Sequence, residues 1–344
     1  MRATCVITSI FPPTASVASF ARSPAFEQVI VVGDLKSPER YDLAGTRFIP
    51  VGEQRGQSWR MNSRLPFNHY CRKMIGYLEA VRDGARILFD TDDDNCLIDG
   101  QPGDLWSTAC DLEAGAQLAG QAYVNVYRHF TDQPIWPRGL PLDLIKQARS
   151  AVVPVRPRSD AATVGVWQGL ANGDPDVDAI YRLVSNEPCD FAAKPAVVLP
   201  QGLCCPFNSQ NTAFLRELLP LMYLPAFVSF RYTDILRGLI AQPVMWAAGY
   251  RLAFAAPSVF QERNAHDYVK DFQSEVSMYL TGRQAYEIAV ATSSPSRSMA
   301  DNLKAVYGAL AERQIVEARE TELLSLWLDD CATALSRSAP APAT

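Results

Sequence analysis

Four aspartates within five positions constrain this chain more than any other feature of its sequence. Directly after the apolar run 87–89 come Asp90, Asp92, Asp93 and Asp94. Neighbouring carboxylates repel each other by roughly 1 to 4 kcal/mol per pair at intermediate dielectric, and a bridging cation relieves that repulsion. Hard oxygen ligands suit Mg²⁺, Mn²⁺ or Ca²⁺, and Mg²⁺ typically binds one or two carboxylates together with substrate phosphates. The pattern predicts a strand that ends at a site for a metal and a diphosphate; the alternative is a solvated acidic turn.

Composition excludes several classes of protein. With 48% hydrophobic residues, 20% charged residues and a net charge of −5, the 344-residue chain is typical of a globular protein with a sizeable core. It has no concentrated Lys/Arg stripe, which disfavours a nucleic-acid binder. The first 13 residues predict a strand rather than a signal peptide, and no stretch reaches the roughly 18 to 20 apolar residues of a membrane span.

Eight scattered cysteines, without a Cys-x-x-Cys pair, indicate free thiols in a reducing compartment. We therefore expect a cytoplasmic protein, and leave peripheral attachment to a membrane open.

Short apolar runs alternate with helical spacing in the first third of the chain. Strands are predicted at residues 4–10, 26–32, 47–51 and 87–89, and a helix at 68–83. Strands separated by helices imply βαβ units and a mostly parallel sheet, in which ligands bind at the carboxyl ends of the strands. The acidic cluster and Asp34 both follow predicted strands, so we expect them at the same edge.

The second half of the chain is less regular. The Pro-rich run 150–158 is either a linker or an edge strand, and strands are expected at 196–199 and 249–257. Helices are expected at 211–219 and 232–246, with Pro243 ending or kinking the latter. Helical spacing continues from residue 300 to about 335, and the tail 336–344 is predicted to be disordered.

Several residues are candidates for binding a nucleotide donor. Asp34 could accept a hydrogen bond from a nucleobase or ribose, or only close a Gly-Asp turn. The same crevice would be lined by Thr8, Ser9 and Ile10. Arg72 and Lys73 precede the cluster on the predicted helix, where they would offset the charge of a diphosphate or form a solvated basic face.

Metal and diphosphate ligands are expected within the acidic cluster. Asp92 and Asp94 are the predicted metal ligands, although spacing alone does not settle which pair binds the metal. Asp90 would position or contact the nucleoside. His266 either contacts the metal or a phosphate, or has no ligand role.

Asp234 lies at the start of a predicted helix. It is either the N-cap of that helix or a general base that deprotonates an acceptor hydroxyl. Arg231 and Arg237, close by in the sequence, would hold the leaving diphosphate.

Short motifs follow one another in order from about residue 70 to 240. They include Arg72-Lys-Met-Ile-Gly-Tyr77 and Phe89-Asp-Thr-Asp-Asp93, and the segments 84–93, 98–100, 136–142, 173–178, 199–202, 206–212 and 234–238. The series resembles the STELLO proteins, glycosyltransferase-like proteins of plants, and more broadly the GT-A class of nucleotide-sugar glycosyltransferases. In that class an Asp-x-Asp motif holds a divalent metal and the sugar donor.

The resemblance implies a GT-A, Rossmann-like α/β fold: a mixed, mostly parallel sheet flanked by helices, with a C-terminal helical extension. It implies a transferase domain over residues 1–290, with a donor half at about 1–150 and an acceptor half at about 151–290. The helical extension would cover 291–335.

Two fainter likenesses concern the same residues. Asp92-Asp-Asp-Asn-Cys96 and Arg231-Tyr-Thr-Asp234 are similar to motifs of plant reversibly glycosylated polypeptides, the UDP-arabinopyranose mutases. Asp234-Ile-Leu-Arg237 is also similar to the Glu-Asp motif of family 2 inverting transferases, whose Asp is the catalytic base; here Thr233 replaces the Glu.

Together the residues and the resemblance predict a metal-dependent glycosyltransferase using Mn²⁺ or Mg²⁺. It would move a sugar from a nucleotide-diphosphate sugar to a glycan or another hydroxyl acceptor. The alternatives are a nucleotide-sugar mutase and a non-catalytic relative that binds nucleotide sugars. STELLO proteins carry a membrane anchor, whereas this sequence shows none, so we expect a soluble or peripherally attached enzyme.

Overall fold

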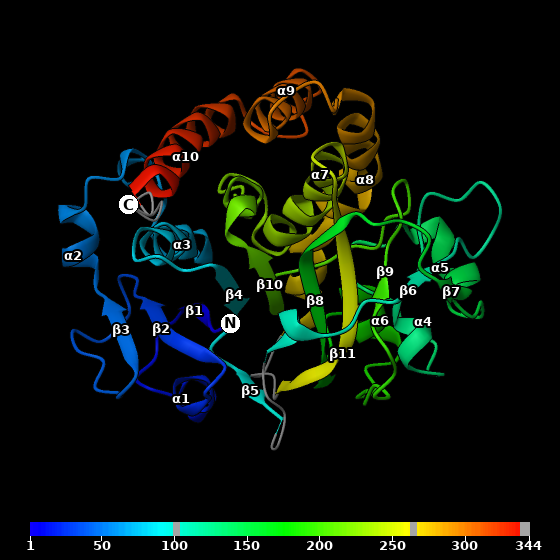
Figure 1. Cartoon of the computed structure of the whole chain (residues 1–344), viewed down its shortest axis with the longest axis horizontal. Helices are drawn as coiled ribbons and strands as arrows, with labels where there is room; N and C mark the ends of the chain where they lie inside the picture. Colours follow the sequence, from blue (N-terminus) through cyan, green and yellow to red (C-terminus); the bar gives the residue numbers. More distant parts are fainter. Residues whose placement is uncertain (99–103, 262–266, 338–344) are drawn as a thin grey trace, which may run out of the picture.

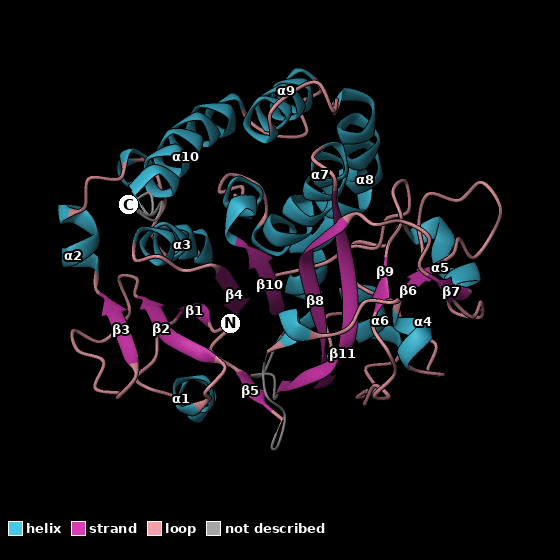
Figure 2. Ribbon diagram, in the orientation of Figure 1, coloured by secondary structure: helices cyan, strands magenta, loops and turns pink. Residues whose placement is uncertain are grey.

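The computed structural model describes residues 1–98, 104–261 and 267–337. Within these ranges eleven strands form one mixed sheet, in the order β3-β2-β1-β4-β10-β8-β11-β9-β6-β7, with β5 paired to β11 off this path. Helices cover both faces of the sheet, with α1 on one side and α3 and α7–α10 on the other (Figure 1; Figure 2). This mixed α/β architecture, with helices at the C-terminus, confirms the predicted fold class.

The N-terminal part of the sheet is parallel. It consists of β1 (Ala3–Thr8), β2 (Phe26–Val32), β3 (Thr46–Ile49) and β4 (Ile87–Thr91). The connecting helices are α1 (Ala15–Arg22), α2 (Val51–Gly56) and α3 (Lys73–Arg82). All four predicted strands are confirmed, and the carboxyl ends of β1 and β4 lie side by side.

Strand β10 (Asn211–Leu215) lies antiparallel between β4 and β8 (Thr163–Gly173). The sequence predicted a helix at 211–219, which is wrong. The apolar spacing there does continue into a 3₁₀ helix, η4 (Arg216–Met222). Pairing with a strand on each side outweighs local helical preference over the first five residues.

The other half of the sheet is built around β11 (Tyr250–Gln261), which runs parallel to β8. The short strands are β5 (Asn95–Leu97), β6 (Leu112–Ala114), β7 (Val155–Pro157) and β9 (Val197–Val198). Strand β7 ends the sheet order, which confirms the edge-strand interpretation of the Pro-rich run. An edge strand tolerates proline because one side needs no hydrogen-bond donor.

Short helical segments connect these strands. They are η1 (Arg60–Ser63), η2 (Tyr70–Arg72), η3 (Leu105–Ser107), α4 (Tyr127–Phe130), α5 (Leu142–Ala148), α6 (Ala179–Val184) and η5 (Phe230–Tyr232).

Successive side chains of β1 point to opposite faces of the sheet and pack into a separate core on each face. Cys5 and Ile7 pack in one cluster with α1, whereas Val6 packs in the other beneath α3. Gly76 lets α3 approach the sheet closely, since a Cβ there would overlap the side chains of Val6 and Val32. This close approach brings the first residue of α3 next to the end of β4.

The C-terminal helices are α7 (Thr233–Ala247), α8 (Tyr268–Thr292), α9 (Met299–Glu312) and α10 (Ala318–Arg337). Helix α7 confirms the helix predicted at 232–246. Pro243 does not end it: the helix continues to Ala247, with buried residues on both sides of the proline. The helical spacing from 300 to 335 corresponds to two helices. Helix α10 extends past the predicted start of the tail at 336, and residues 338–344 lie outside the described part.

No helix within the described ranges is long and apolar enough to cross a membrane. The cytoplasmic location stays a prediction.

Helix α10 packs on α3 and shares its core cluster. The Trp327 side chain is fully buried, and its indole Nε1 donates to the carbonyl of Pro220 at 3.1 Å. The C-terminal helices therefore support the same face of the sheet that carries α3.

We predict that Trp327→Ala lowers the free energy of unfolding by about 3 to 5 kcal/mol, because it removes a large buried side chain. Urea denaturation measures this loss. Leu280→Ala is the control: Leu280 is 76% exposed, so the change should stay within about 0.5 kcal/mol. A loss for Trp327→Ala as small as that of the control would contradict the packing role of α10.

Candidate functional site: a carboxylate-lined cavity at the strand ends

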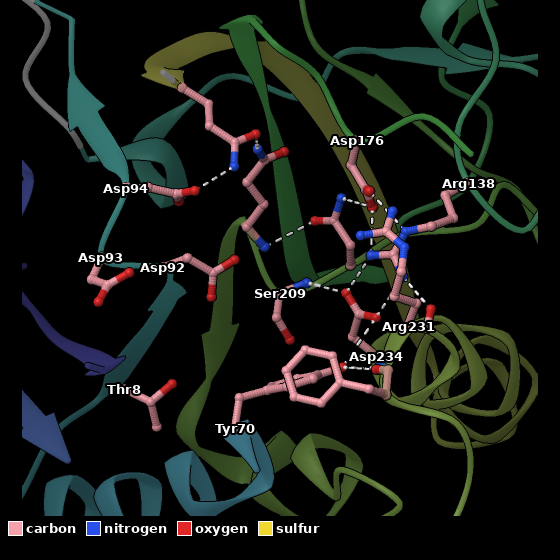
Figure 3. Close-up of a pocket in the computed structure, with 14 residues that line it drawn as sticks. Thr8, Tyr70, Asp92, Asp93, Asp94, Arg138, Asp176, Ser209, Arg231 and Asp234 are labelled. Carbon is pink, nitrogen blue, oxygen red and sulfur yellow. Dashed lines mark hydrogen bonds and ion pairs between the residues drawn. The ribbon is translucent and has the colours of Figure 1, made fainter. Parts of the chain in front are cut away.

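A cavity of about 280 Å³ opens at the carboxyl ends of β1 and β4. Figure 3 shows carboxylates on its two opposite sides. The aspartates that follow β4 lie on one side, near Thr8, and Asp176 and Asp234 lie on the other, near Arg138. The fold thus gathers acidic side chains that are distant in the sequence.

Asp90, the first aspartate of the cluster, lies inside the protein. Its Oδ1 accepts a hydrogen bond from Lys73 Nζ at 3.0 Å, and its Oδ2 accepts one from Arg237 Nη1 at 2.8 Å. All three side chains are buried. Asp90 was predicted to position or contact the nucleoside, and Arg237 to hold the leaving diphosphate. The two form a buried ion pair and do not line the cavity, so neither can contact a ligand there directly.

Lys73 joins this buried pair to the cavity wall. Its ammonium also donates to Asp92 Oδ1 at 2.9 Å and to the carbonyl of Thr91 at 2.8 Å. The interpretation of Lys73 and Arg72 as a solvated basic face is wrong, because both are almost fully buried. Lys73 compensates charge within the cluster itself.

The next three aspartates all line the cavity, and each is held differently. Asp93 accepts a hydrogen bond from Ser9 Oγ at 2.5 Å, and Asp94 accepts one from Gln261 Nε2 at 3.0 Å. Burial raises the pKa of Asp92 to about 6; Lys73 opposes this shift and the charge of Asp94 adds to it. Two carboxylates that disfavour each other's ionisation make a place where a cation would be stabilised.

The carboxylate oxygens of Asp92 and Asp94 are of the kind that a divalent metal binds. No group of three or more His, Cys, Asp or Glu side chains with metal-binding spacing occurs among the described residues. Asp92 and Asp94 together supply carboxylate oxygens, which suit Mg²⁺ or Mn²⁺ when phosphate oxygens and water complete the coordination shell. His266, the third predicted ligand, lies outside the described residues.

On the opposite side, one guanidinium binds two carboxylates. Arg138 donates to Asp176 from Nε at 2.8 Å and Nη2 at 3.0 Å, and to Asp234 from Nη1 at 3.2 Å and Nη2 at 3.0 Å. Burial acts to raise the pKa of Asp176, but Arg138, Arg231 and Asn208 together hold this pKa below its usual value. The three groups carry a net charge of −1 when both carboxylates are ionised.

Asp234 is further oriented by Tyr70 and Ser209. The Tyr70 hydroxyl donates to Asp234 Oδ1 at 3.3 Å, and the Ser209 amide donates to Oδ2 at 3.3 Å. The N-cap interpretation of Asp234 is wrong: Tyr232 occupies the N-cap position, and Asp234 lies in the first turn of α7. Its carboxylate therefore faces the cavity with a fixed orientation.

Of the two arginines predicted near Asp234, only Arg231 lines the cavity. Its Nε donates to the buried Glu275 of α8 at 2.6 Å. Its Nη2 is buried and makes no hydrogen bond within the described structure. Arg231 thus has capacity for a ligand, although Glu275 holds part of its guanidinium.

The remaining residues that were predicted to bind the donor do not all line the cavity. Thr8 lines the cavity, while Ile10 is 40% exposed just beyond the end of β1. The carboxylate of Asp34 accepts hydrogen bonds from the amides of Leu35 at 2.7 Å and His69 at 3.1 Å, so it holds a loop rather than lining the cavity.

Arg72 points away from the cavity. Its guanidinium binds Gln54 Oε1, with Nε at 2.8 Å, and stacks over the ring of Phe67 at 4.1 Å. The predicted contact with a diphosphate is therefore not seen for Arg72.

Several residues that line the cavity have no role predicted from the sequence: Tyr70, Arg138, Asp176, Asn208, Ser209, Gln210, Phe230 and Gln261. A signal was present for most of them. The motif segments 136–142, 173–178 and 206–212 contain Arg138, Asp176 and the run 208–210. The motifs therefore mark the cavity wall, but their spacing does not show that they meet there.

We predict that Arg138→Met lowers the free energy of unfolding at pH 7 by about 3 to 5 kcal/mol, because it leaves two buried carboxylates without their cation. Urea denaturation measures the loss, and adding Asp176→Asn and Asp234→Asn should recover most of it. The control is Arg60→Met, since the exposed Arg60–Asp329 pair is worth at most about 1 kcal/mol. Equal losses for the two single variants would contradict the structural role of Arg138.

The sequence matches the family model of STELLO glycosyltransferases over residues 231–337. It is 28% identical to "Probable glycosyltransferase STELLO2" of Arabidopsis thaliana over 318 residues, covering 88% of this chain and 41% of that protein. It is 27% identical to STELLO1 of the same plant over 333 residues, covering 92% of this chain and 42% of that protein. The chain thus spans less than half the length of these relatives.

Among solved structures, the fold is similar to a crystal structure of GalNAc-T7 with UDP, GalNAc and Mn²⁺. The TM-score is 0.36 at 9% identity, covering 96% of this chain and 58% of the other. That likeness is too distant to support an inference about the site. The family match and the two plant relatives, in contrast, confirm the resemblance to STELLO-type glycosyltransferases that the motifs predict.

Proposed function

We propose that this chain is a metal-dependent glycosyltransferase that moves a sugar from a nucleotide-diphosphate sugar to an acceptor hydroxyl. One observation carries the proposal: a single cavity has Asp92 and Asp94 on one side and the oriented carboxylate of Asp234 on the other. Asp92 and Asp94 suit the binding of a metal and a diphosphate, and Asp234 suits the role of a general base. The similarity to proteins named as probable glycosyltransferases supports this reading.

The donor would bind at the strand ends, with its diphosphate toward Asp92 and Asp94. A bound Mn²⁺ or Mg²⁺ supplies positive charge that stabilises the departing diphosphate. Thr8, at the end of β1, lies close enough to the cluster to line the same cavity, and Ser9 fixes Asp93 beside it. Arg231 lines the cavity on the Asp234 side, where Glu275 and Asp271 already offset its charge, so its part in holding the leaving group is secondary to that of the metal.

Asp234 would accept the proton of the acceptor hydroxyl. Its hydrogen bonds to Arg138, Tyr70 and the Ser209 amide fix the carboxylate before substrate binds, so little reorganisation is needed. Since Arg138 is shared with Asp176, the group carries one uncompensated negative charge. A proton arriving on Asp234 neutralises that charge and leaves Arg138 paired with Asp176.

The donor side is tested by Asp92→Asn and Asp94→Asn. We predict that each variant loses the stabilisation that a nucleotide-diphosphate sugar gives in the presence of Mn²⁺. In the wild type, ligand at 100 times its dissociation constant should add about 2.7 kcal/mol of stability, which a thermal-shift assay over a panel of UDP- and GDP-sugars detects. EDTA should abolish the wild-type response.

The matched control is Asp111→Asn, an exposed aspartate away from the cavity, which should respond as the wild type does. Unchanged metal-dependent stabilisation in both cluster variants would refute the proposed donor site.

The acceptor side is tested by Asp234→Asn. We predict that it reduces the transfer rate by about 10² to 10⁴, the usual contribution of a general base, while metal-dependent donor binding persists. The transfer rate is measured as the formation of free nucleoside diphosphate from the donor, with and without acceptor. A protein that isomerises the donor sugar with no acceptor present would be a mutase instead. A fully active Asp234→Asn variant would remove Asp234 from the mechanism.

A further inference from the structure

Three aromatic rings meet at the Asp234 side of the cavity. Tyr70 and Phe230 pack edge to face with ring centroids 4.8 Å apart, and His69 lies 5.2 Å from Phe230 and stacks on Tyr70 at 5.3 Å. Burial lowers the pKa of His69 to about 4, so its ring is neutral near pH 7. The cluster joins two segments, η2 and η5, that precede α3 and α7.

Phe230 remains 51% exposed although it contacts two other rings. Isolated exposed apolar residues are common, but this one lines a cavity whose other members are mainly polar. Its position is also fixed relative to Asp234. The Tyr70 hydroxyl accepts from the amide of Asp234 at 3.0 Å, and its single hydrogen is shared between the carbonyl of Phe230 and Asp234 Oδ1, each 3.3 Å from the hydroxyl oxygen.

A buried hydroxyl without a partner lies in the same cavity. Ser209 is 2% exposed and lines the cavity, yet its Oγ makes no hydrogen bond within the described structure. Buried polar atoms normally have partners. A ligand that brings hydroxyl groups into the cavity would satisfy Ser209 Oγ, and the amide of the same residue already donates to Asp234.

We infer that the acceptor is a carbohydrate whose pyranose ring packs on Phe230 while its hydroxyls reach Ser209 and Asp234. This inference rests on the proposed function. A pyranose presents one face of weakly positive C–H groups, which suits the negative face of an aromatic ring, and a rim of hydroxyls, which suits carboxylates and amides. Phe230 and the polar wall offer this combination within one cavity.

The lining argues against a lipid alcohol as acceptor. Among its described residues, only Phe230 and Tyr70 carry a large apolar surface. Burying an acyl or isoprenoid chain requires apolar cover along many methylene groups, and two aromatic side chains cover only a few of them. The rings suit one sugar face instead.

The experiment compares acceptors and then variants. With the donor that gives the strongest metal-dependent stabilisation, the probes are methyl hexopyranosides, a Ser/Thr peptide and farnesol. We expect transfer to at least one methyl glycoside and not to the other two. Phe230→Ala should lower kcat/KM for that glycoside by about tenfold, and Phe230→Trp should retain it. Ser209→Ala should also lower it.

Phe272→Ala is the matched control, because Phe272 is a partly exposed aromatic residue of α8 that does not line the cavity. It should leave kcat/KM unchanged. Metal-dependent stabilisation by the donor in Phe230→Ala serves as the check that this variant is folded.

Transfer to the peptide or to farnesol but to no glycoside would overturn the inference, as would a Phe230→Ala loss no larger than that of Phe272→Ala. Hydrolysis of the donor by the wild type without acceptor separates the two proposals. If hydrolysis occurs and glycosides are not used, the acceptor inference alone fails. If the donor neither binds nor reacts, the proposed function fails and the inference with it.

Discussion

The arrangement of the site depends on one buried carboxylate held between two cations. Asp90, the penultimate residue of β4, binds Lys73 at the start of α3 and Arg237 in the first turns of α7. Taking such charges out of water is costly, and removing one partner of a buried pair usually costs several kcal/mol. The three elements are thereby fixed to one another. Because Asp92 follows Asp90 by two residues and Asp234 precedes Arg237 by three, the same ion pairs set the spacing of the two cavity walls.

The local sequence pattern was sufficient to predict the parallel half of the sheet and the position of the acidic cluster at its edge. Each of those strands is a short apolar run bounded by turn residues, and β2 lies at the predicted residues. Prediction from local pattern failed where contacts with residues distant in the sequence determine the secondary structure. Residues 211–215 have apolar spacing compatible with a helix, but two neighbouring strands make them β10. Helix α8 was not predicted because its apolar residues do not gather on one side; Leu280 and Val269 are exposed, whereas Met278 is buried.

The candidate site, like the fold, was predicted from the sequence only in part. Sequence identifies charged residues but not the direction in which they point, so Arg72, Lys73 and Arg237 all suggested a phosphate contact. In the structure their buried side chains bind other protein groups: Gln54, Asp90 and the cavity-lining Asp92. Conversely, Arg138 and Asp176 lay within motifs that carried the family resemblance, yet no spacing rule shows that one guanidinium binds both Asp176 and Asp234. That relation arises only when the two segments are packed together.

Strand β10 has a consequence for how the chain can be divided. It supplies the neighbour of β4 from the second half of the sequence, with Asn211–Leu215 paired to Ile87–Thr91. A fragment that stopped near residue 150 would contain the acidic cluster but would leave β4 with an open, apolar edge. Open edges of this kind recruit other strands and lead to aggregation. The two halves are therefore interlocked through the sheet, and a part of the chain that retained the acidic cluster alone would not be a stable, separable module.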